Sequence, residues 1–336
     1  MISSIEKMNI IRIWINNARP IALPQSLLPA ILAICLAVKV NGFNIWLGIL
    51  AVLGVVAGHL GMNLFDDYFD YRVKESGYRD TLNRKGFRAR ISKCHYLTSG
   101  EASLRQLLVA CFTFGTIALF FGAIIWYFRG NFILWLALIT AVVGVSYSGP
   151  PLRLSYRGLG ELVIGFIFGP LLMTGVYYAA CGHWDYSLLF VSVPVGMLVT
   201  NIVYSHAIMD YEPDKEVGKM TFARLLKSKK GMLLFHQLLV NSAYLLIVIG
   251  IVIGFLPIYY GLVFLTFPLA VYQQYLMVQF IKNPDRSFSP KWWMGPMGDW
   301  EKIKAGGLDW FMIRWLSARN LLSFFCLIII IISFIP

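Results

Sequence analysis

The chain has 336 residues, of which 58% are hydrophobic and 14% charged, with a mean hydropathy of +0.68. A soluble globular protein carries about 25% charged residues, so this composition excludes that class. It predicts an all-α polytopic membrane protein with one transmembrane domain over residues 1–336. The net charge of +12 does not indicate nucleic acid, because basic residues in the loops of a membrane protein account for it.

Nine apolar stretches follow one another along the chain, and most reach the roughly 20 residues that cross a hydrocarbon core. They are residues 21–40, 44–65, 104–128, 132–147, 159–181, 187–208, 232–254, 257–280 and 318–335. The stretch at 132–147 is short. The sequence therefore predicts nine transmembrane helices embedded in a lipid bilayer.

Lysines and arginines are concentrated in alternate loops. The N-terminal segment holds Lys7, Arg12 and Arg19, and the next loops of this set hold eight basic residues from Arg72 to Lys93, then Arg153 and Arg157, then six from Lys215 to Lys230 and seven from Lys282 to Arg319. The loops of the other set hold only Lys39 and Arg129. Cytoplasmic loops of membrane proteins carry the excess of positive charge. We therefore expect a multi-pass protein of the cell inner membrane with a cytoplasmic N-terminus, and a basic cytoplasmic loop at 71–102.

The second apolar stretch ends in the sequence GMNLFDDYFDY, residues 61–71. Asn63, Asp66, Asp67 and Asp70 are spaced so that they share one face of a helix. Unpaired carboxylates are costly at the edge of a bilayer, which points to a function. Carboxylates with an amide oxygen suit Mg²⁺, which typically takes one or two carboxylates and fills its octahedron with water and substrate phosphates.

A second acidic motif follows the sixth apolar stretch, where Asp210 and Asp214 are four residues apart. The loop charges place both motifs at the cytoplasmic side, so they can face each other across a cavity. Basic residues follow each motif, including Lys74 after the first and Lys219 after the second. A metal-bridged diphosphate is the ligand that this pattern predicts.

An ion-coupled carrier is the alternative of another class, because carboxylates within a membrane also mark ion pathways. Carriers tend to place ion sites near the midplane on broken helices, whereas both motifs here lie at one side, on helices that we expect to be continuous. His59 and His206 lie one turn before the motifs. Without thiolates or HExxH spacing they do not predict zinc, and we interpret them as packing or supporting groups.

The chain resembles the UbiA superfamily of intramembrane prenyltransferases, on the motifs NLFDDYFDY and DYEPDKEVGK. The resemblance implies nine helices around a central cavity, with the two motifs on helices two and six binding a polyprenyl diphosphate through Mg²⁺. It assigns the metal to Asn63 and the five aspartates of the motifs, which would act in catalysis. The residues implied to bind substrate are Arg19, Asn63, Lys74, Tyr147, Arg153 and Lys219, with Arg157 as the alternative to Arg153.

The long stretch from Tyr147 to Tyr178 resembles the 1,4-dihydroxy-2-naphthoate prenyltransferases of menaquinone synthesis. This implies transfer of a polyprenyl group to that aromatic acceptor, giving demethylmenaquinone. Two features of this chain, Asp66 and the sequence HAIM at 206–209, depart from that branch. The branch usually has asparagine at the first position and a different sequence at the second. The HAIM stretch is closer to the 4-hydroxybenzoate branch, so 4-hydroxybenzoate or another aromatic acceptor of the superfamily is the alternative. The faces of Tyr68 or Tyr147 could stabilise an allylic cation.

Three further patterns concern packing. The segment 283–317 holds five tryptophans among basic residues, which favours an interfacial loop over a substrate lid. Gly165 and Gly169 form a GxxxG pair that is typical of close helix packing. Ser103 and Gln106 have the spacing of a capping box.

Overall fold

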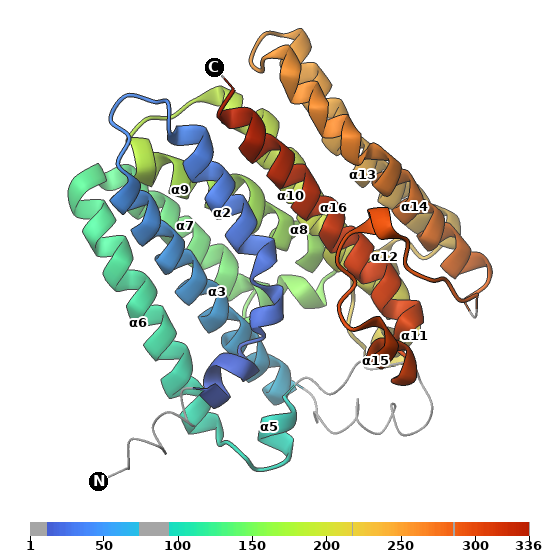
Figure 1. Cartoon of the computed structure of the whole chain (residues 1–336). Coiled ribbons are helices and arrows are strands. Elements are labelled where there is room, and N and C mark those ends of the chain that lie inside the picture. The colour runs from blue at the N-terminus through green and yellow to red at the C-terminus, as the bar shows by residue number, and fades with distance from the viewer. Residues whose placement is uncertain (1–11, 74–93, 217, 285, 336) are drawn as a thin grey trace.

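The computed structural model describes residues 12–73, 94–216, 218–284 and 286–335. Within these ranges the chain is helical and contains no strand, which confirms the all-α prediction. The long helices run roughly side by side as a bundle (Figure 1). The predicted site residue Lys74 and most of the basic loop 71–102 lie outside the described residues.

Eight helical segments of the described chain are long and apolar enough to cross a membrane. They are α3 (Ile45–Val73), α6 (Leu104–Arg129), α7 (Asn131–Ser148), α8 to α9 (Gly160–Cys181), η4 with α10 (Tyr186–Met209), α13 (Lys229–Val252), η5 with α14 (Ile258–Lys282) and α16 (Asp309–Ser333). Another apolar helix, α2 (Pro24–Ala37), has only 14 residues. That α2 crosses the membrane as a ninth span therefore stays a prediction.

Two helices extend beyond the apolar stretches that predicted them. Helix α3 continues past residue 65 to Val73, and α16 begins at Asp309 rather than 318. The apolar run ends where polar side chains reach the membrane surface, but the backbone hydrogen bonds of a helix can continue into that region. The first aspartate motif therefore lies entirely within a helix, as its spacing predicted.

Two of the nine predicted segments, the fifth (159–181) and the eighth (257–280), are irregular. The fifth consists of α8 (Gly160–Phe166), the π-helical η3 (Ile167–Leu171) and α9 (Leu172–Cys181). The eighth begins as the 3₁₀ helix η5 (Ile258–Thr266) before α14 (Phe267–Lys282). Shorter elements connect the long ones: η1 (Pro20–Ala22), α5 (His95–Thr98), η2 (Leu154–Tyr156), α11 (Tyr211–Glu216), α12 (Phe222–Leu225), η6 (Trp292–Met294) and α15 (Trp300–Ala305).

The buried apolar side chains form two clusters. The larger one surrounds α10 (Leu189–Met209), which packs against α8, α13 and α16, and continues through α2 and α9. The smaller one lies at the end of α3, where Leu60 and Leu64 pack with Tyr96, Leu97 and Leu107. The smaller cluster fixes the end of the helix that carries the first aspartate motif.

The tryptophan-rich segment is not a loop throughout, because its last residues belong to α16. Its members differ in exposure: Trp292 is 93% exposed, whereas Trp315 is buried. The segment is attached to α14 and α16 through Trp293 against Tyr272 and through Asn320, whose Nδ2 donates to the carbonyls of Met294 and Pro296. An exposed indole beside packed ones is consistent with a position at the membrane surface, which stays a prediction.

Arg129, one of the few basic residues of the other set of loops, has a structural role. Its Nε donates to the carbonyl of Ala179 at 2.8 Å and its Nη2 to the carbonyl of Ala180 at 2.8 Å. The same Nη2 reaches the carbonyl of Gly42 at 3.1 Å. The carbonyls of the last turn of a helix lack partners within it, so Arg129 caps α9.

The predicted capping box and GxxxG contact are both confirmed. Ser103 caps α6, and Gln106 returns a hydrogen bond to the Ser103 N–H at 2.8 Å. A Cβ built on Gly169 would lie 2.5 Å from the Gly196 Cα, and one on Gly165 would lie 2.6 Å from the Gly196 carbonyl oxygen. The backbones of the fifth segment and α10 therefore touch, which only glycine at these positions allows.

We predict that Gly169→Ala lowers the free energy of unfolding by about 1–3 kcal/mol, because the added methyl group forces two backbones apart. Gly175→Ala in the same segment is the matched control, since a Cβ there meets no atom within 4 Å. Thermal unfolding of the two variants in detergent measures the difference. Equal midpoints for both variants would contradict the close approach.

Candidate functional site

The four residues of the first motif, Asn63, Asp66, Asp67 and Asp70, lie in the last turns of α3. A continuous helix places them on one face, as the spacing predicted. In Figure 1 this end of α3 and helix α11, which carries Asp214, both lie in the lower half of the bundle. The two motifs therefore belong to the same end of the molecule.

Arg19 is the cation of the first motif. Its Nη2 lies 3.1 Å from Asp67 Oδ1 and 3.5 Å from Asp66 Oδ2, and it donates to the Asn63 carbonyl at 2.7 Å. The residue has a left-handed backbone with φ of 59° and precedes Pro20 of η1. Non-glycine residues seldom adopt this conformation, and the contacts of the guanidinium with α3 offset its cost.

Three hydroxyl groups from other segments donate to the same carboxylates. The Tyr96 hydroxyl in α5 donates to Asp67 Oδ2 at 3.1 Å. Ser148, the last residue of α7, donates to Asp66 Oδ1, and Tyr156 in η2 donates to Asp70 Oδ1. Each carboxylate of the motif therefore has a protein donor.

Asp67 is the most enclosed of the three carboxylates, with 2% of its side chain exposed. Burial would lower the pKa of Arg19, but the carboxylates of Asp67, Asp66 and Asp70 outweigh it and hold that pKa above its usual range. Burial, followed by the Asp67 charge, raises the pKa of Tyr96. Arg19 therefore stays charged and Tyr96 stays a neutral donor at physiological pH.

Asn63 differs from its neighbours because its amide nitrogen is already used. Its Nδ2 donates to the Ala18 carbonyl at 2.9 Å, so Oδ1 is directed the other way. The contact joins the segment before α2 to α3 next to Arg19. The amide oxygen Oδ1 is the atom of this side chain that can accept a hydrogen bond or contact a cation.

The second motif spans a break in the sixth segment. Helix α10 ends at Met209, Asp210 is its C-terminal cap, and α11 begins at Tyr211, so the continuous helix that we predicted is wrong at this point. The Asp214 N–H still bonds to the Asp210 carbonyl at 2.8 Å, which preserves the spacing of four residues along one face. Both aspartates are buried.

His206 supports the second motif, as we expected from its position. Its Nε2 lies 2.9 Å from Asp210 Oδ2, one helical turn away. Phe311 of α16 packs edge-on against the imidazole, with ring centroids 5.3 Å apart. The histidine ring is thus held between Asp210 and the final helix.

The basic residues differ in how they are placed. Arg153 is half-buried with a left-handed backbone, and its buried Nε has no hydrogen-bond partner within the described chain. Arg157 is exposed and donates to the Pro151 carbonyl at 3.2 Å. This geometry favours Arg153 of the two alternatives. Lys219 is half-buried beyond the second motif, and its N–H bonds to the Asp214 carbonyl at 2.9 Å.

The two aromatic candidates occupy different settings. Tyr147, near the end of α7, is half-buried, and a Cβ on Gly160 would lie 3.3 Å from its ring. The Tyr68 ring lies under the Arg72 guanidinium at 5.5 Å, and its hydroxyl accepts from Arg72 Nη1 at 2.8 Å. Tyr68 therefore already faces a cation of the protein itself.

Within the described ranges, no three His, Cys, Asp or Glu side chains cluster closely enough to hold a metal ion by themselves. The donors of Arg19, Ser148 and Tyr156 occupy the carboxylates of the first motif instead. The chemistry of the donor set nevertheless suits Mg²⁺, which needs only one or two carboxylates when water and phosphate oxygens complete its shell.

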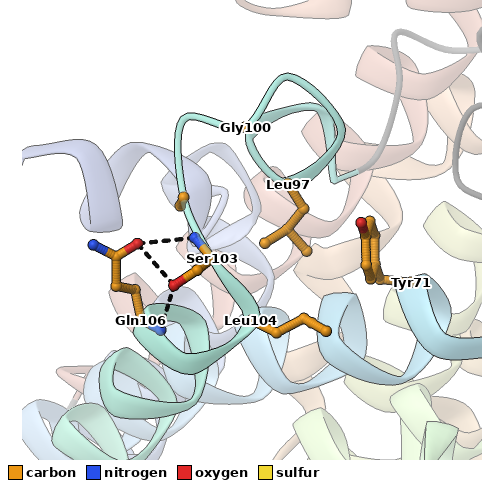
Figure 2. A pocket seen from close by; sticks show the side chains of 7 residues that line it. Tyr71, Leu97, Gly100, Ser103, Leu104 and Gln106 are labelled. Carbon is orange, nitrogen blue, oxygen red and sulfur yellow. Dashed lines mark hydrogen bonds between the residues drawn. The ribbon is translucent and has the colours of Figure 1, made fainter.

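A hollow of about 430 Å³ lies beside the first motif, where Tyr71, Leu97, Leu104 and the Ser103–Gln106 capping box meet (Figure 2). Tyr71 directly follows Asp70, and Leu97 directly follows Tyr96. None of the candidate site residues lines it. The hollow is therefore separate from the carboxylate face.

Three donors to the first motif, Tyr96, Ser148 and Tyr156, were not predicted from the sequence. Ser148 and Tyr156 lie in the stretch Tyr147–Tyr178 that carried the family resemblance, so their region was marked but their contacts were not. Tyr96 had no signal, because a single tyrosine in a polar loop is not distinctive.

A family model described as the UbiA prenyltransferase family matches residues 26–295. The chain belongs to the UbiA prenyltransferase family. It is accordingly a transferase, and the alternative of an ion-coupled carrier is set aside. The match covers both aspartate motifs and the irregular fifth segment.

Two relatives are named 1,4-dihydroxy-2-naphthoate octaprenyltransferase. The one from Mycobacterium tuberculosis is 25% identical over 70% of this chain and 77% of its own length, and the one from Bacillus subtilis is 26% identical over 74% and 77%. Both alignments extend over most of each protein.

Solved structures agree on the fold. A structure of digeranylgeranylglyceryl phosphate synthase covers 97% of this chain and 99% of its own, with a TM-score of 0.62 and 16% identity. A UbiA homologue from Archaeoglobus fulgidus bound to GPP and Mg²⁺ covers 93% and 99%, with a TM-score of 0.54 and 18% identity. The helical arrangement is thus that of the UbiA intramembrane enzymes.

Proposed function

We propose that this family member transfers a polyprenyl group from its diphosphate to 1,4-dihydroxy-2-naphthoate. The observation that carries the proposal is the pair of aspartate motifs at one end of an apolar bundle, with Asp67, Asp210 and Asp214 buried and Arg19 among the first set of carboxylates. Named relatives of this activity align over most of the chain and support the choice of acceptor.

The proposed metal is Mg²⁺, held by oxygens of Asn63 and of the aspartates of both motifs, Asp66, Asp67, Asp70, Asp210 and Asp214. When bound, it would neutralise the negative charge that develops on the departing diphosphate. The homologue solved with GPP and Mg²⁺ supports this pairing of ligands. Asp67 and Asp210 are the central groups, because each is buried and each is oriented by a neighbour, Arg19 or His206.

Arg19, Lys74, Arg153 and Lys219 are the proposed cations for diphosphate oxygens, with Arg153 favoured over Arg157 by its half-buried position. Their charge stabilises the same oxygens without needing a proton transfer. Tyr147, at the end of α7, is the proposed aromatic face toward the reacting allylic carbon. Apolar surroundings exclude water, which would otherwise capture that carbon.

The bonds of the proposed reaction balance without a further reactant. The allylic C–O bond breaks and its electron pair leaves with the diphosphate, while the ring carbon that bears the carboxylate forms a C–C bond to the prenyl group. That carboxylate then leaves as CO₂ and returns its bonding pair to the ring. The product is the reduced form of demethylmenaquinone.

The proposed orientation has the N-terminus and the catalytic end at the cytoplasmic face of the inner membrane. The loop charges support it, and the role of Arg129 as a helix cap explains an exception to them. In a variant without native cysteines, we expect a cysteine at Ser228 to react only from inside and one in the 183–186 loop only from outside. The opposite labelling pattern would refute the orientation.

We predict that Asp67→Asn and Asp210→Asn each lower turnover at least a hundredfold while leaving the protein folded, because the amide keeps the shape but loses the charge that attracts a cation. Glu212→Gln is the matched control, since Glu212 is an exposed acid in α11. Mg²⁺-dependent release of diphosphate measures turnover, and monodisperse elution in detergent measures folding. Wild-type rates in either asparagine variant would remove that residue from the site.

The acceptor is tested with membranes that contain the protein, a labelled polyprenyl diphosphate and Mg²⁺. With 1,4-dihydroxy-2-naphthoate we expect a labelled lipid-soluble product and one CO₂ for each diphosphate released. The alternative acceptor is 4-hydroxybenzoate, because the HAIM stretch at 206–209 is closer to that branch. If only 4-hydroxybenzoate gives a labelled product, the protein is still a prenyltransferase but the proposed acceptor is wrong.

A further inference from the structure

The turn between α7 and α8, residues 149–159, lies between the two aspartate motifs. On one side, Tyr156 of this turn donates a hydrogen bond to Asp70 of the first motif. On the other side, Glu161, the second residue of α8, contacts Phe222, which follows the second motif in the chain. The turn and the start of α8 therefore touch the surroundings of both motifs.

Glu161 makes an unusual contact for a residue of an apolar segment. Its side chain is buried, and its Oε1 and Oε2 accept the Phe222 N–H at 3.0 and 3.2 Å. Phe222 is the first residue of α12, and the N–H groups at the start of a helix lack acceptors within it. A buried carboxylate is costly without hydrogen bonds, so this contact secures both partners.

A second close contact joins the turn 149–159 to α12. Gly158 has a positive φ of 78°, and a Cβ built on it would lie 2.3 Å from Leu225 Cδ1. Leu225 belongs to α12, as does Phe222. The turn and the first residues of α8 thus contact both ends of this short helix.

Helix α12 is in turn tied to the second motif. Arg224 donates from Nη1 to the Asp214 carbonyl at 3.3 Å and to the Lys219 carbonyl, and the Lys219 N–H bonds to the Asp214 carbonyl at 2.9 Å. Lys219 therefore has a backbone position set by Asp214 on one side and by Arg224 on the other. Glu161 in turn fixes the start of α12 through its contact with Phe222.

We propose that Glu161 is a positioning residue that docks the segment 218–226 onto α8 and so holds Lys219 in place relative to the first motif. The inference rests on the proposed function, in which Lys219 binds the prenyl diphosphate. In this role Glu161 acts through the position of Lys219 and does not itself contact either substrate. Its loss frees the segment, and the expected result is weaker binding of the diphosphate with little effect on the acceptor.

The first test compares Glu161→Ala, which removes the acceptor oxygens, with Glu161→Gln, which keeps one. We expect Glu161→Ala to raise KM for the polyprenyl diphosphate about tenfold, the cost of one hydrogen bond to a charged group. KM for the aromatic acceptor should stay within about twofold, and Glu161→Gln should recover most of the loss. Glu216→Ala, an exposed acid in α11, is the control.

The second test does not need activity. Trypsin cleavage after Lys219, Arg224 and Lys227 reports whether the segment is docked, because all three lie in or next to it. In detergent without substrate, we expect cleavage in Glu161→Ala to be at least fivefold faster than in the parent, Glu161→Gln and Glu216→Ala. The thermal midpoint of Glu161→Ala shows whether the change is local.

The two tests separate the inference from the proposed function. If the parent protein consumes no polyprenyl diphosphate, the proposed function is wrong. The cleavage rates alone then show whether Glu161 docks the segment 218–226. Unchanged cleavage in Glu161→Ala overturns the inference even if the enzyme is active. Equal increases in both KM values with a large fall in thermal midpoint also overturn it, because they indicate general loss of structure.

Discussion

The compensation of buried carboxylates at the end of α3 is the constraint on which the rest of this site depends. Asp67 is 2% exposed, and a carboxylate removed from water costs several kcal/mol unless it is paired and hydrogen-bonded. Its partners, Arg19 and Tyr96, come from the segment before α2 and from α5. Folding must therefore bring these separate segments together before the charge can be buried.

The same constraint explains why the structure is closely packed around the motif. Asp66 and Asp70 accept from Ser148 and Tyr156, which lie about eighty residues further along the chain. Each of these donors belongs to a connection or a helix end. The connections and helix ends therefore carry the polar contacts of the first motif, and the long helices hold them in place.

These protein donors also bear on how a ligand can enter. They satisfy carboxylates that would otherwise repel one another. In the proposed function, a cation at these carboxylates competes with the same donors for the carboxylate oxygens. Arg19 is the exception, because a guanidinium can contact a carboxylate and a phosphate oxygen at once through its five donors.

Much of the fold could be predicted from the sequence because it depends on local periodicity. Apolar stretches of helix length located the long helices, and spacing alone placed Asp66, Asp67 and Asp70 on one helical face. The GxxxG pair correctly indicated the contact of Gly169 with Gly196. These patterns repeat within a few residues, so one sequence is enough to detect them.

The partners of the carboxylates could not be predicted, because they lie far away in the chain. Nothing local distinguishes Tyr96, which meets Asp67 across 29 residues, from other tyrosines of this aromatic-rich chain. The helix break at Asp210 is different, because Pro213 lies three residues further on and is a local signal for a helix end that the spacing argument did not use. Contacts such as that of Tyr96 with Asp67 are set by the tertiary fold alone.

The division between local and distant contacts has a consequence for specificity within the family. Relatives that are about a quarter identical can keep the helices, because many apolar sequences satisfy the same packing. The connections at the end that carries the aspartate motifs are constrained differently, since each donor there must meet one particular acceptor. The segments 149–161 and 206–226 combine such contacts with residues next to both motifs. Differences in acceptor choice between branches should therefore follow changes in these two segments more closely than overall identity. Exchanging both segments together preserves the Glu161–Phe222 contact, whereas exchanging only one of them can break it.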